Sequence, residues 1–526
     1  MKQFVVLLLV SFSISSAQAI SWNVTRDAWT DADEAEYSQF VQSIGLALES
    51  GVCDTAESCI KNAPGNFLKN AEDAGLAMHV DCADLPYALR SYFAMKKGLP
   101  FSYASEIVAA PAPAGEELKV RDIRYSSYGN LITARKSIVQ STSDFNAYWD
   151  RLIDIVASGM YRTHPIRQNG SLESDMYSTD IKSIKPGTNI YDPAGHVAVV
   201  YKIGSSGRIF FIDAHPDNSL TRGSYGQKFA RSRPFAGAGF RNFRPIRVVD
   251  GRAKLAANEE IPNFSTVQYF GTNPAPEGQS WSKGLFILNG EALLYYDYVR
   301  AVMAGGRVTV DPILELTEMV DGLCLDAKDR VRSVKDAVKN GLSNKPHIGR
   351  LPYNIFGTDG EWESFSTPSR DARLKTSFKE LHDNVEEWLR MYAEGSPRIV
   401  YAGANLKGDL RAAYDTMVGR CSLKFENTAG ERVRFTLNDL VDNIWKLSFS
   451  PYHCPELRWG GIGGLSSSCS SGDKVKWYKA QAKLRNQIER TYEVRMNYSA
   501  EELLTGSGMS LGVSTPPEVD VRKLLN

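Results

Sequence analysis

The segment His79–Pro100, HVDCADLPYALRSYFAMKKGLP, combines a cysteine with the periodic pattern of a helix that packs on a core. Apolar side chains recur every four positions after the cysteine, at Leu85, Leu89 and Phe93. Gly98 ends the pattern, because glycine is the residue that most often follows a helix. We therefore expect a helix here that carries Cys82 at its N-terminus.

Cys82 is the residue of this segment with reactive chemistry. A thiol at a helix N-terminus faces unpaired backbone N–H groups and the positive end of the helix dipole, and both favour the thiolate. The sequence thus makes Cys82 a candidate nucleophile. Pro86 complicates the start of the helix, since it cannot donate to the carbonyl of Cys82 four residues earlier. Either the first turn is bent, or the helix begins nearer Asp84.

A nucleophilic cysteine needs a base, and the best candidate is His196. Two runs, the β-branched and alternating 196–203 and then 208–213, read as strands joined by the turn 204–207, Gly-Ser-Ser-Gly. In an antiparallel pair, the start of the first strand lies beside the end of the second. The carboxylate of Asp213 can then orient the imidazole and stabilise its protonated form.

Two other arrangements compete with this one. His215 could take the third position instead, but it falls in the turn 214–217 after the strand, so we favour Asp213. His79 lies three residues before Cys82, and the two could form a zinc site with His196 and either Asp213 or His215.

The order of these residues resembles the papain-like cysteine peptidase superfamily in its NlpC-type and transglutaminase-like branches. The NlpC-type lead-in to the histidine is matched by Lys185-Pro186-Gly187 and Gly195-His196-Val197. The transglutaminase-like cysteine helix and strand end are matched by Asp81-Cys82-Ala83-Asp84-Leu85, Gly98-Leu99-Pro100 and Ile212-Asp213. The resemblance covers roughly residues 70 to 220. His196 follows Cys82 by 114 positions (196 − 82), which requires an insertion, and Pro86 also departs from the pattern.

The resemblance implies an α+β fold in which a papain-like catalytic domain, with its helix-borne cysteine packed on an antiparallel sheet, precedes a mostly helical accessory region. It implies a cysteine peptidase or amidase with catalytic residues Cys82, His196 and Asp213, no cofactor, and a peptide or peptidoglycan substrate. A transglutaminase-like acyl transferase would use the same three residues. A third possibility is a non-catalytic protein that binds peptides or stiffens the cell envelope.

The cysteine count gives an independent argument about Cys82. The chain has seven cysteines, and an exported protein oxidises its thiols in pairs, so that one is left over. Proximity in sequence pairs Cys53 with Cys59 and Cys454 with Cys469. Elimination then pairs Cys324 with Cys421 and leaves Cys82 free, in agreement with its choice as nucleophile.

Residues 1–19 read as a cleaved secretory signal, with Lys2, a short apolar run and Ala17-Gln18-Ala19. We therefore expect export to the periplasm or the extracellular space, with no transmembrane segment. The 61 basic and 61 acidic residues balance, which gives no indication of nucleic-acid binding.

The 526 residues are too many for one ordinary core. We expect a catalytic domain over 20–250, with an insertion around 101–180 that contains a helix at 143–160, and a helical region over 251–526. Helical spacing recurs there at 291–303, 312–340, 372–393, 438–447 and 474–494, whereas 353–360 and 460–471 read as loops. The arginine- and glycine-rich stretch 222–247 reads as a solvated irregular loop, with a substrate-lining loop as the alternative.

Overall fold

The computed structural model describes residues 20–142, 144–274, 284–355, 360–365, 368–465, 469, 472–489, 495–506 and 512–526. The predicted signal segment, parts of both predicted C-terminal loops and the end of the last predicted helix lie outside these residues. The described chain has antiparallel sheets and helices, which confirms the α+β class.

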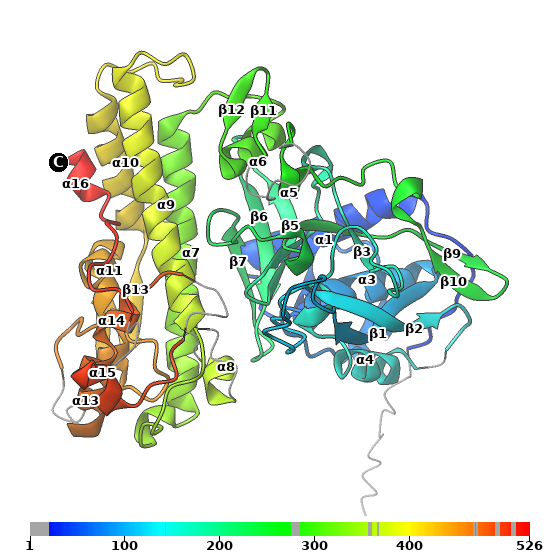
Figure 1. Ribbon diagram of the computed structural model, residues 1–526, viewed down its shortest axis with the longest axis horizontal. Coiled ribbons are helices and arrows are strands. Elements are labelled where there is room, and N and C mark those ends of the chain that lie inside the picture. Colours follow the sequence, from blue (N-terminus) through cyan, green and yellow to red (C-terminus); the bar gives the residue numbers. More distant parts are fainter. Residues whose placement is uncertain are drawn as a thin grey trace, which may run out of the picture.

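A six-stranded antiparallel sheet positions the predicted histidine and aspartate (Figure 1). Its strands, in spatial order, are β3 (Met176–Ser178), β8 (Gly239–Phe243), β4 (Asn189–Asp192), β5 (His196–Ile203), β6 (Ile209–Ala214) and β7 (Leu220–Ser224). Strand β5 has the predicted bounds, and β6 begins and ends one residue later than predicted. The pairing of Val199 with Ile212 puts the start of β5 near the end of β6, as the short turn requires.

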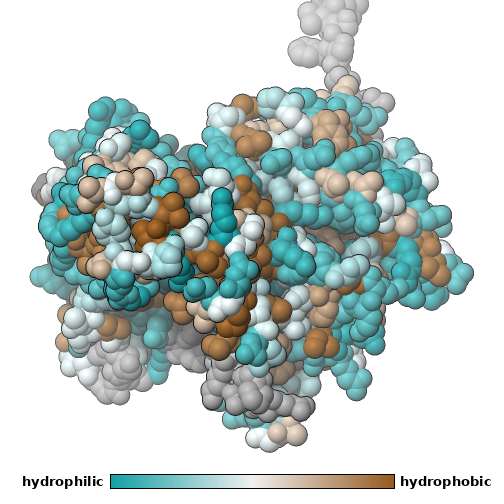
Figure 2. Space-filling model, turned by 90° about the horizontal axis from the view of Figure 1, so that it is seen from above, coloured by the Kyte–Doolittle hydropathy of each residue, from teal (hydrophilic) through white to brown (hydrophobic). Residues whose placement is uncertain are grey.

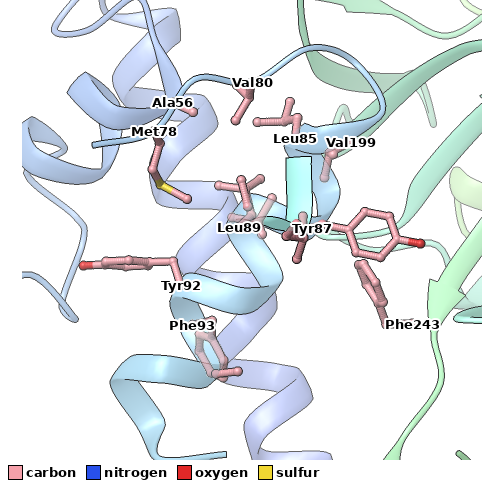
Figure 3. Packing of buried hydrophobic residues seen from close by; sticks show 14 of the residues in the cluster. Ala56, Met78, Val80, Leu85, Tyr87, Leu89, Tyr92, Phe93, Val199 and Phe243 are labelled. Carbon is pink, nitrogen blue, oxygen red and sulfur yellow. The ribbon is translucent and has the colours of Figure 1, made fainter. Parts of the chain in front are cut away.

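The two faces of the sheet belong to different cores because side chains alternate along β5. Val197 and Val199 pack with the helices α1 (Asp31–Glu49) and α3 (Asp84–Lys97) on one face. Ala198 and Val200 pack on the other face with α6 (Tyr295–Met303). Figure 3 shows the first core, in which Leu85 of α3 lies beside Val199 and Tyr87 faces Phe243.

Helix α3 is the predicted cysteine helix, and its start resolves the question raised by Pro86. The helix begins at Asp84, so that Pro86 lies in the first turn, where its missing N–H has no helical acceptor to lose. It ends at Lys97, and Gly98, which follows it, has a left-handed φ of 64°.

The region predicted as an insertion adds a hairpin and a short helix beside α3. Strands β1 (Phe101–Ala109) and β2 (Asn130–Ile138) pair antiparallel, and α4 (Phe145–Ile153) follows. The helix predicted at 143–160 is therefore shorter, and only a 3₁₀ turn, η2 (Ser158–Met160), continues it. Smaller elements of the first 300 residues are α2 (Ala56–Asn62), η1 (Ala71–Gly75), η3 (Ile181–Ser183), η4 (Pro234–Ala236), β9 (Ile246–Val249), β10 (Arg252–Leu255), η5 (Asn258–Glu260), α5 (Val267–Phe270), β11 (Phe286–Leu288) and β12 (Glu291–Leu293).

The interpretation of 222–247 as a solvated irregular loop is wrong in part, because most of the stretch is buried, although 225–238 is irregular apart from the turn η4. Strands β7, β8 and β9 take up much of it, and Arg241 and Arg244 are buried. Their guanidinium groups donate to backbone carbonyls, such as Arg241 to Thr163 and Arg244 to Ala256 at 2.8 Å. Buried arginines are tolerated because these carbonyls satisfy their donors.

Helices dominate the rest of the chain and form a separate core. The long helices α7 (Pro312–Lys339), α9 (Pro368–Ala393) and α10 (Leu406–Arg420) stand side by side, and α7 runs along the edge strand β7 (Figure 1). The remaining elements are η7 (Leu342–Asn344), α8 (Glu361–Phe365), β13 (Leu423–Glu426), β14 (Arg432–Phe435), α11 (Leu437–Asn443), η8 (Ile444–Lys446), α12 (Pro455–Arg458), α13 (Gly472–Ala480), α14 (Ala482–Arg485), α15 (Ala500–Thr505) and α16 (Arg522–Leu525).

Three disulfides join the cysteines in the predicted pairs, Cys53–Cys59, Cys324–Cys421 and Cys454–Cys469. Such bonds persist in oxidising compartments, as expected for an exported protein.

Within the described ranges, every helix is too short or too polar to cross a bilayer. Seen from above, hydrophobic residues lie among hydrophilic ones on both halves of the molecule (Figure 2).

Candidate active site

Cys82 lies in a tight turn immediately before α3, and hydrogen bonds hold this turn in place. The Asp81 carboxylate accepts from the backbone N–H groups of Ala83, at 2.8 Å, and Asp84, at 3.1 Å. The Asp84 carboxylate accepts from the Asp81 N–H at 3.1 Å. Tyr161 donates its hydroxyl proton to the Ala83 carbonyl at 2.6 Å. The turn thus fixes the direction in which the cysteine side chain leaves the backbone.

The Cys82 sulfur lies against the first residues of β5. Its Sγ is 4.0 Å from the Gly195 carbonyl oxygen, and the Val197 N–H donates a hydrogen bond to it. Gly195 and Val197 flank His196 in the chain. The side chain is half-buried and the thiol is free, as the cysteine pairing predicted.

His196 and Asp213 meet as the strand pairing predicted. His196 Nε2 lies 2.8 Å from Asp213 Oδ2, and both side chains are about nine-tenths buried. The other carboxylate oxygen accepts from the Thr221 hydroxyl, which also bonds to His215 at 2.9 Å. His215 therefore does not replace Asp213 as the partner of His196 but belongs to the group that surrounds the carboxylate.

The sulfur and the imidazole are not joined by a hydrogen bond in the described part of the chain. His196 Nδ1 likewise has no hydrogen-bond partner among the described residues. The structure therefore brings His196 and Asp213 into contact and places Cys82 against the backbone on both sides of His196. Catalytic hydrogen bonds are often long or poorly aligned without substrate, so this geometry leaves the catalytic assignment a prediction.

The surroundings of Cys82 favour the thiol, contrary to the expectation that the helix N-terminus favours the thiolate. Burial raises the pKa of Cys82 above its ordinary value, and the Asp81 charge raises it further. The Val197 N–H and Arg373 lower the same pKa by less. Desolvation therefore outweighs the helix end, and the resting group is a neutral thiol.

His196 and Asp213 each have a defined protonation state at neutral pH. Burial and the Arg373 charge lower the pKa of His196, while its hydrogen bond to Asp213 raises it, so that the ring is neutral at neutral pH. Burial raises the pKa of Asp213, but the hydrogen bonds from His196 and Thr221 are among the interactions that outweigh this and bring it below the usual value. The pair is a neutral imidazole that donates to a carboxylate.

His196 and Asp213 line a cleft between both regions of the chain that contains about 740 Å³ of solvent-open empty space, whereas Cys82 is not one of its lining residues. The sheet side supplies His196, Phe211, Asp213, His215, Thr221, Arg222, Lys228 and Phe229. The helical side supplies Asp326, Asp329, Arg330, Ser333, Arg370, Asp371, Arg373, Leu374 and Arg458. Nothing in the spacing of the α7 and α9 residues marks them as site residues. A helical pattern with charges between apolar positions reads as a solvated face.

The alternative of a zinc site lacks the contact that it needs from His79. The His79 ring bonds to the Pro216 carbonyl oxygen at 3.3 Å rather than to the group around Cys82. Among the described residues, ligand atoms close enough for a metal ion occur instead at Cys454, Glu456 and Cys469, and those two cysteines form a disulfide.

Comparisons with protein-family models, with curated proteins and with solved structures give no significant match, so the interpretation of this site depends on its own geometry and chemistry.

Proposed function

We propose that this protein is a papain-like thiol hydrolase that cleaves amide bonds. Cys82 is the nucleophile, His196 the general base and Asp213 the group that orients the ring. The observation that carries the proposal is the His196–Asp213 hydrogen bond of 2.8 Å, located beside the one cysteine that is not in a disulfide. A carboxylate on Nε2 leaves Nδ1 as the ring atom that can accept a proton.

The reaction proceeds in two halves. His196 Nδ1 takes the thiol proton as the sulfur attacks the amide carbonyl carbon, which forms the C–S bond and a tetrahedral oxyanion. The C–N bond then breaks, the imidazolium gives its proton to the leaving amine, and a thioester remains on Cys82. Water attacks the thioester while His196 accepts its proton. The C–S bond breaks, the acid product leaves, and the sulfur recovers the proton from His196.

The backbone N–H of Cys82 is the donor available to the oxyanion. In the described part of the chain it donates to no acceptor, whereas the N–H groups of both flanking residues, Asp81 and Ala83, are bonded to carboxylates. Such a donor next to the nucleophile stabilises the charge that develops in the transition state.

The substrate class follows from the resemblance and from the expected export. The NlpC-type branch acts on cell-wall peptides, and the predicted signal segment would deliver the chain to that compartment. We therefore propose that the substrate is a peptidoglycan peptide.

Digestion of purified peptidoglycan tests the proposal. The wild-type protein should release fragments that carry a new amine and a new carboxylate, as identified by mass spectrometry. Cys82→Ala and His196→Ala should lose activity by roughly a thousandfold or more, because each removes a group that acts in the same unit. His79→Ala is the matched control and should retain activity, since that ring bonds to a surface carbonyl. Undiminished cleavage by Cys82→Ala would refute the mechanism.

The same digestion separates hydrolysis from acyl transfer. With an added primary amine, an acyl transferase would join the amine to the acyl fragment, whereas a hydrolase would release the free acid.

The raised pKa of Cys82 favours a second candidate function, peptide binding without cleavage. In that case peptidoglycan would bind to the protein and remain intact, whereas slow alkylation by iodoacetamide would fit both functions, because the resting thiol is neutral in each.

A further inference from the structure

Helix α9 brings two arginines into the cleft. Arg370 and Arg373 are three positions apart, so both project from the same side of the helix. Both line the cleft that His196 and Asp213 line from the sheet side. Arg370 Nη1 also lies 3.4 Å from the hydroxyl oxygen of Ser333 on α7.

Two acids on the helical side of the cleft pair with cationic side chains. Lys228 pairs with Asp326 at 2.7 Å. Arg330 donates two hydrogen bonds to Asp371, at 2.9 and 3.0 Å.

The third acid on the helical side is Asp329. Burial raises the pKa of Asp329 well above the ordinary value, and the neighbouring Asp213 and Asp326 raise it further. Six cationic side chains and four carboxyl groups line the cleft, so its formal charge is +2 when its histidines are neutral.

Two further observations indicate that this charge faces a ligand position. The Arg373 charge lowers the pKa of both Cys82 and His196, so the guanidinium lies near enough to act on both reacting groups. Arg330 is nine-tenths buried, yet its Nη1 has no acceptor among the described residues. A buried donor without an acceptor is costly, and a bound anion would satisfy it.

We propose that Arg370 and Arg373 bind a carboxylate of the peptide substrate beside Cys82. This inference depends on the proposed function, because it is the peptide substrate that makes the anion a carboxylate. The planar guanidinium matches the two oxygens of a carboxylate. In this proposal, α9 selects peptides that carry a carboxylate, and the turn before α3 supplies the reacting sulfur.

A pair of alkylating reagents tests this without any substrate. Iodoacetate and iodoacetamide both react when sulfur displaces iodide, but only iodoacetate carries a carboxylate. Because the other cysteines form disulfides, Cys82 is the single free thiol, and mass spectrometry confirms where the label is. The readout is the ratio of the two alkylation rates, iodoacetate over iodoacetamide. The same protein unfolded in urea provides the intrinsic ratio of this thiol.

We expect the folded protein to exceed the intrinsic ratio by roughly three- to tenfold, as one or two partly screened charges near the sulfur would produce. Arg370→Gln and Arg373→Gln should each lower the ratio toward the intrinsic value, and Arg373→Lys should keep most of it. The control is Arg390→Gln on the same helix, where the guanidinium is exposed and pairs with Glu387 and Glu394. Unfolding curves identify any variant that has lost its fold.

The possible outcomes separate this inference from the function on which it depends. A raised ratio that falls only in the cleft variants supports the carboxylate site. A reactive Cys82 with the intrinsic ratio, or a ratio that Arg390→Gln changes equally, overturns the carboxylate site and leaves the thiol hydrolase standing. A folded thiol that reacts with neither reagent overturns the carboxylate site, because a small carboxylate does not reach the sulfur, and the peptidoglycan digestion then decides the hydrolase.

Discussion

At the scale of single residues, the contact between His196 and Asp213 determines which ring nitrogen carries the proton. The carboxylate accepts only, so the neutral ring must donate through Nε2 and exist as the Nε2–H tautomer. Nitrogen-15 NMR of the histidine rings should show this tautomer for His196 at pH 7. In Asp213→Asn the side-chain amide can donate to Nε2 instead, which favours the Nδ1–H tautomer and should lower amide hydrolysis by roughly a hundredfold or more.

The control for this prediction is Asp217→Asn in the turn after β6. Asp217 is exposed and accepts from the backbone N–H and the hydroxyl of Ser219, so its neutral analogue should leave the His196 tautomer unchanged. Detection of the Nδ1–H tautomer in the wild-type protein would contradict the assigned roles of both residues.

Single residues also mark the limit of what the sequence can predict about the site. The His196–Asp213 contact follows from two neighbouring strands and a short turn, and the free state of Cys82 follows from an odd cysteine count. The raised pKa of Cys82 does not, because it depends on how much chain covers the sulfur. Arg370 and Arg373 were missed because their role depends on which face of α9 meets the sheet.

At the scale of one element, the N-terminus of α3 depends on Asp81. Its carboxylate accepts two backbone N–H groups in the turn that carries Cys82. Asp81→Ala should lower the free energy of unfolding by about 1–2 kcal/mol, as the loss of a helix cap does. It should also slow peptidoglycan cleavage, because the sulfur would no longer be held against β5. Urea unfolding and the digestion assay measure the two effects.

Asp144→Ala provides the comparison at another helix of the same core. Asp144 caps α4 through the Ala147 N–H at 3.0 Å, and α4 carries no residue of the cleft. A similar loss of stability with normal cleavage is expected. If the two variants lost activity equally, the effect of Asp81 would be one of stability and not of position.

Whether an element could be predicted from sequence depended on where its stability comes from. Strand β5, HVAVVYKI, is rich in β-branched residues and was predicted with its bounds. Helix α10 was missed because Gly408 and Gly419 weaken its intrinsic preference, and packing of Leu410 and Tyr414 in the helical core compensates. Strand β7, LTRGS, has little strand propensity and depends on its pairing with β6.

At the scale of the whole molecule, the cleft exists only because α7 packs along β7 and α9 packs beside α7. The sequence assigned the chemistry to residues 20–250 and no site residues to the helical region. Periodicity shows that a helix is amphipathic but not which partner covers its faces, so the second wall of the cleft could not be anticipated.

The contact between the two regions should itself respond to pH through Glu380 of α9. Its carboxylate accepts from the Gln227 N–H at 2.8 Å, in the segment after β7. Burial raises the pKa of Glu380 from 4.5 to about 7, against the opposing charge of Arg208. Between these two values the folded protein holds a proton that the unfolded chain has released. The contribution of Glu380 to stability is therefore greatest below pH 4.5 and is lost as pH rises toward 7.

The shift of about 2.5 pH units corresponds to about 3 kcal/mol of unfolding free energy. Glu380→Gln keeps an acceptor for Gln227 but cannot ionise. Relative to wild type it should gain stability as pH rises, by about that amount between pH 4.5 and 8, in urea unfolding at each pH. Glu386→Gln, at an exposed position of the same helix, should follow the wild-type profile. A constant difference between Glu380→Gln and wild type across this range would mean that Glu380 is already ionised in the folded protein. The region after β7 and α9 would then be joined by charge pairing rather than through a protonated Glu380.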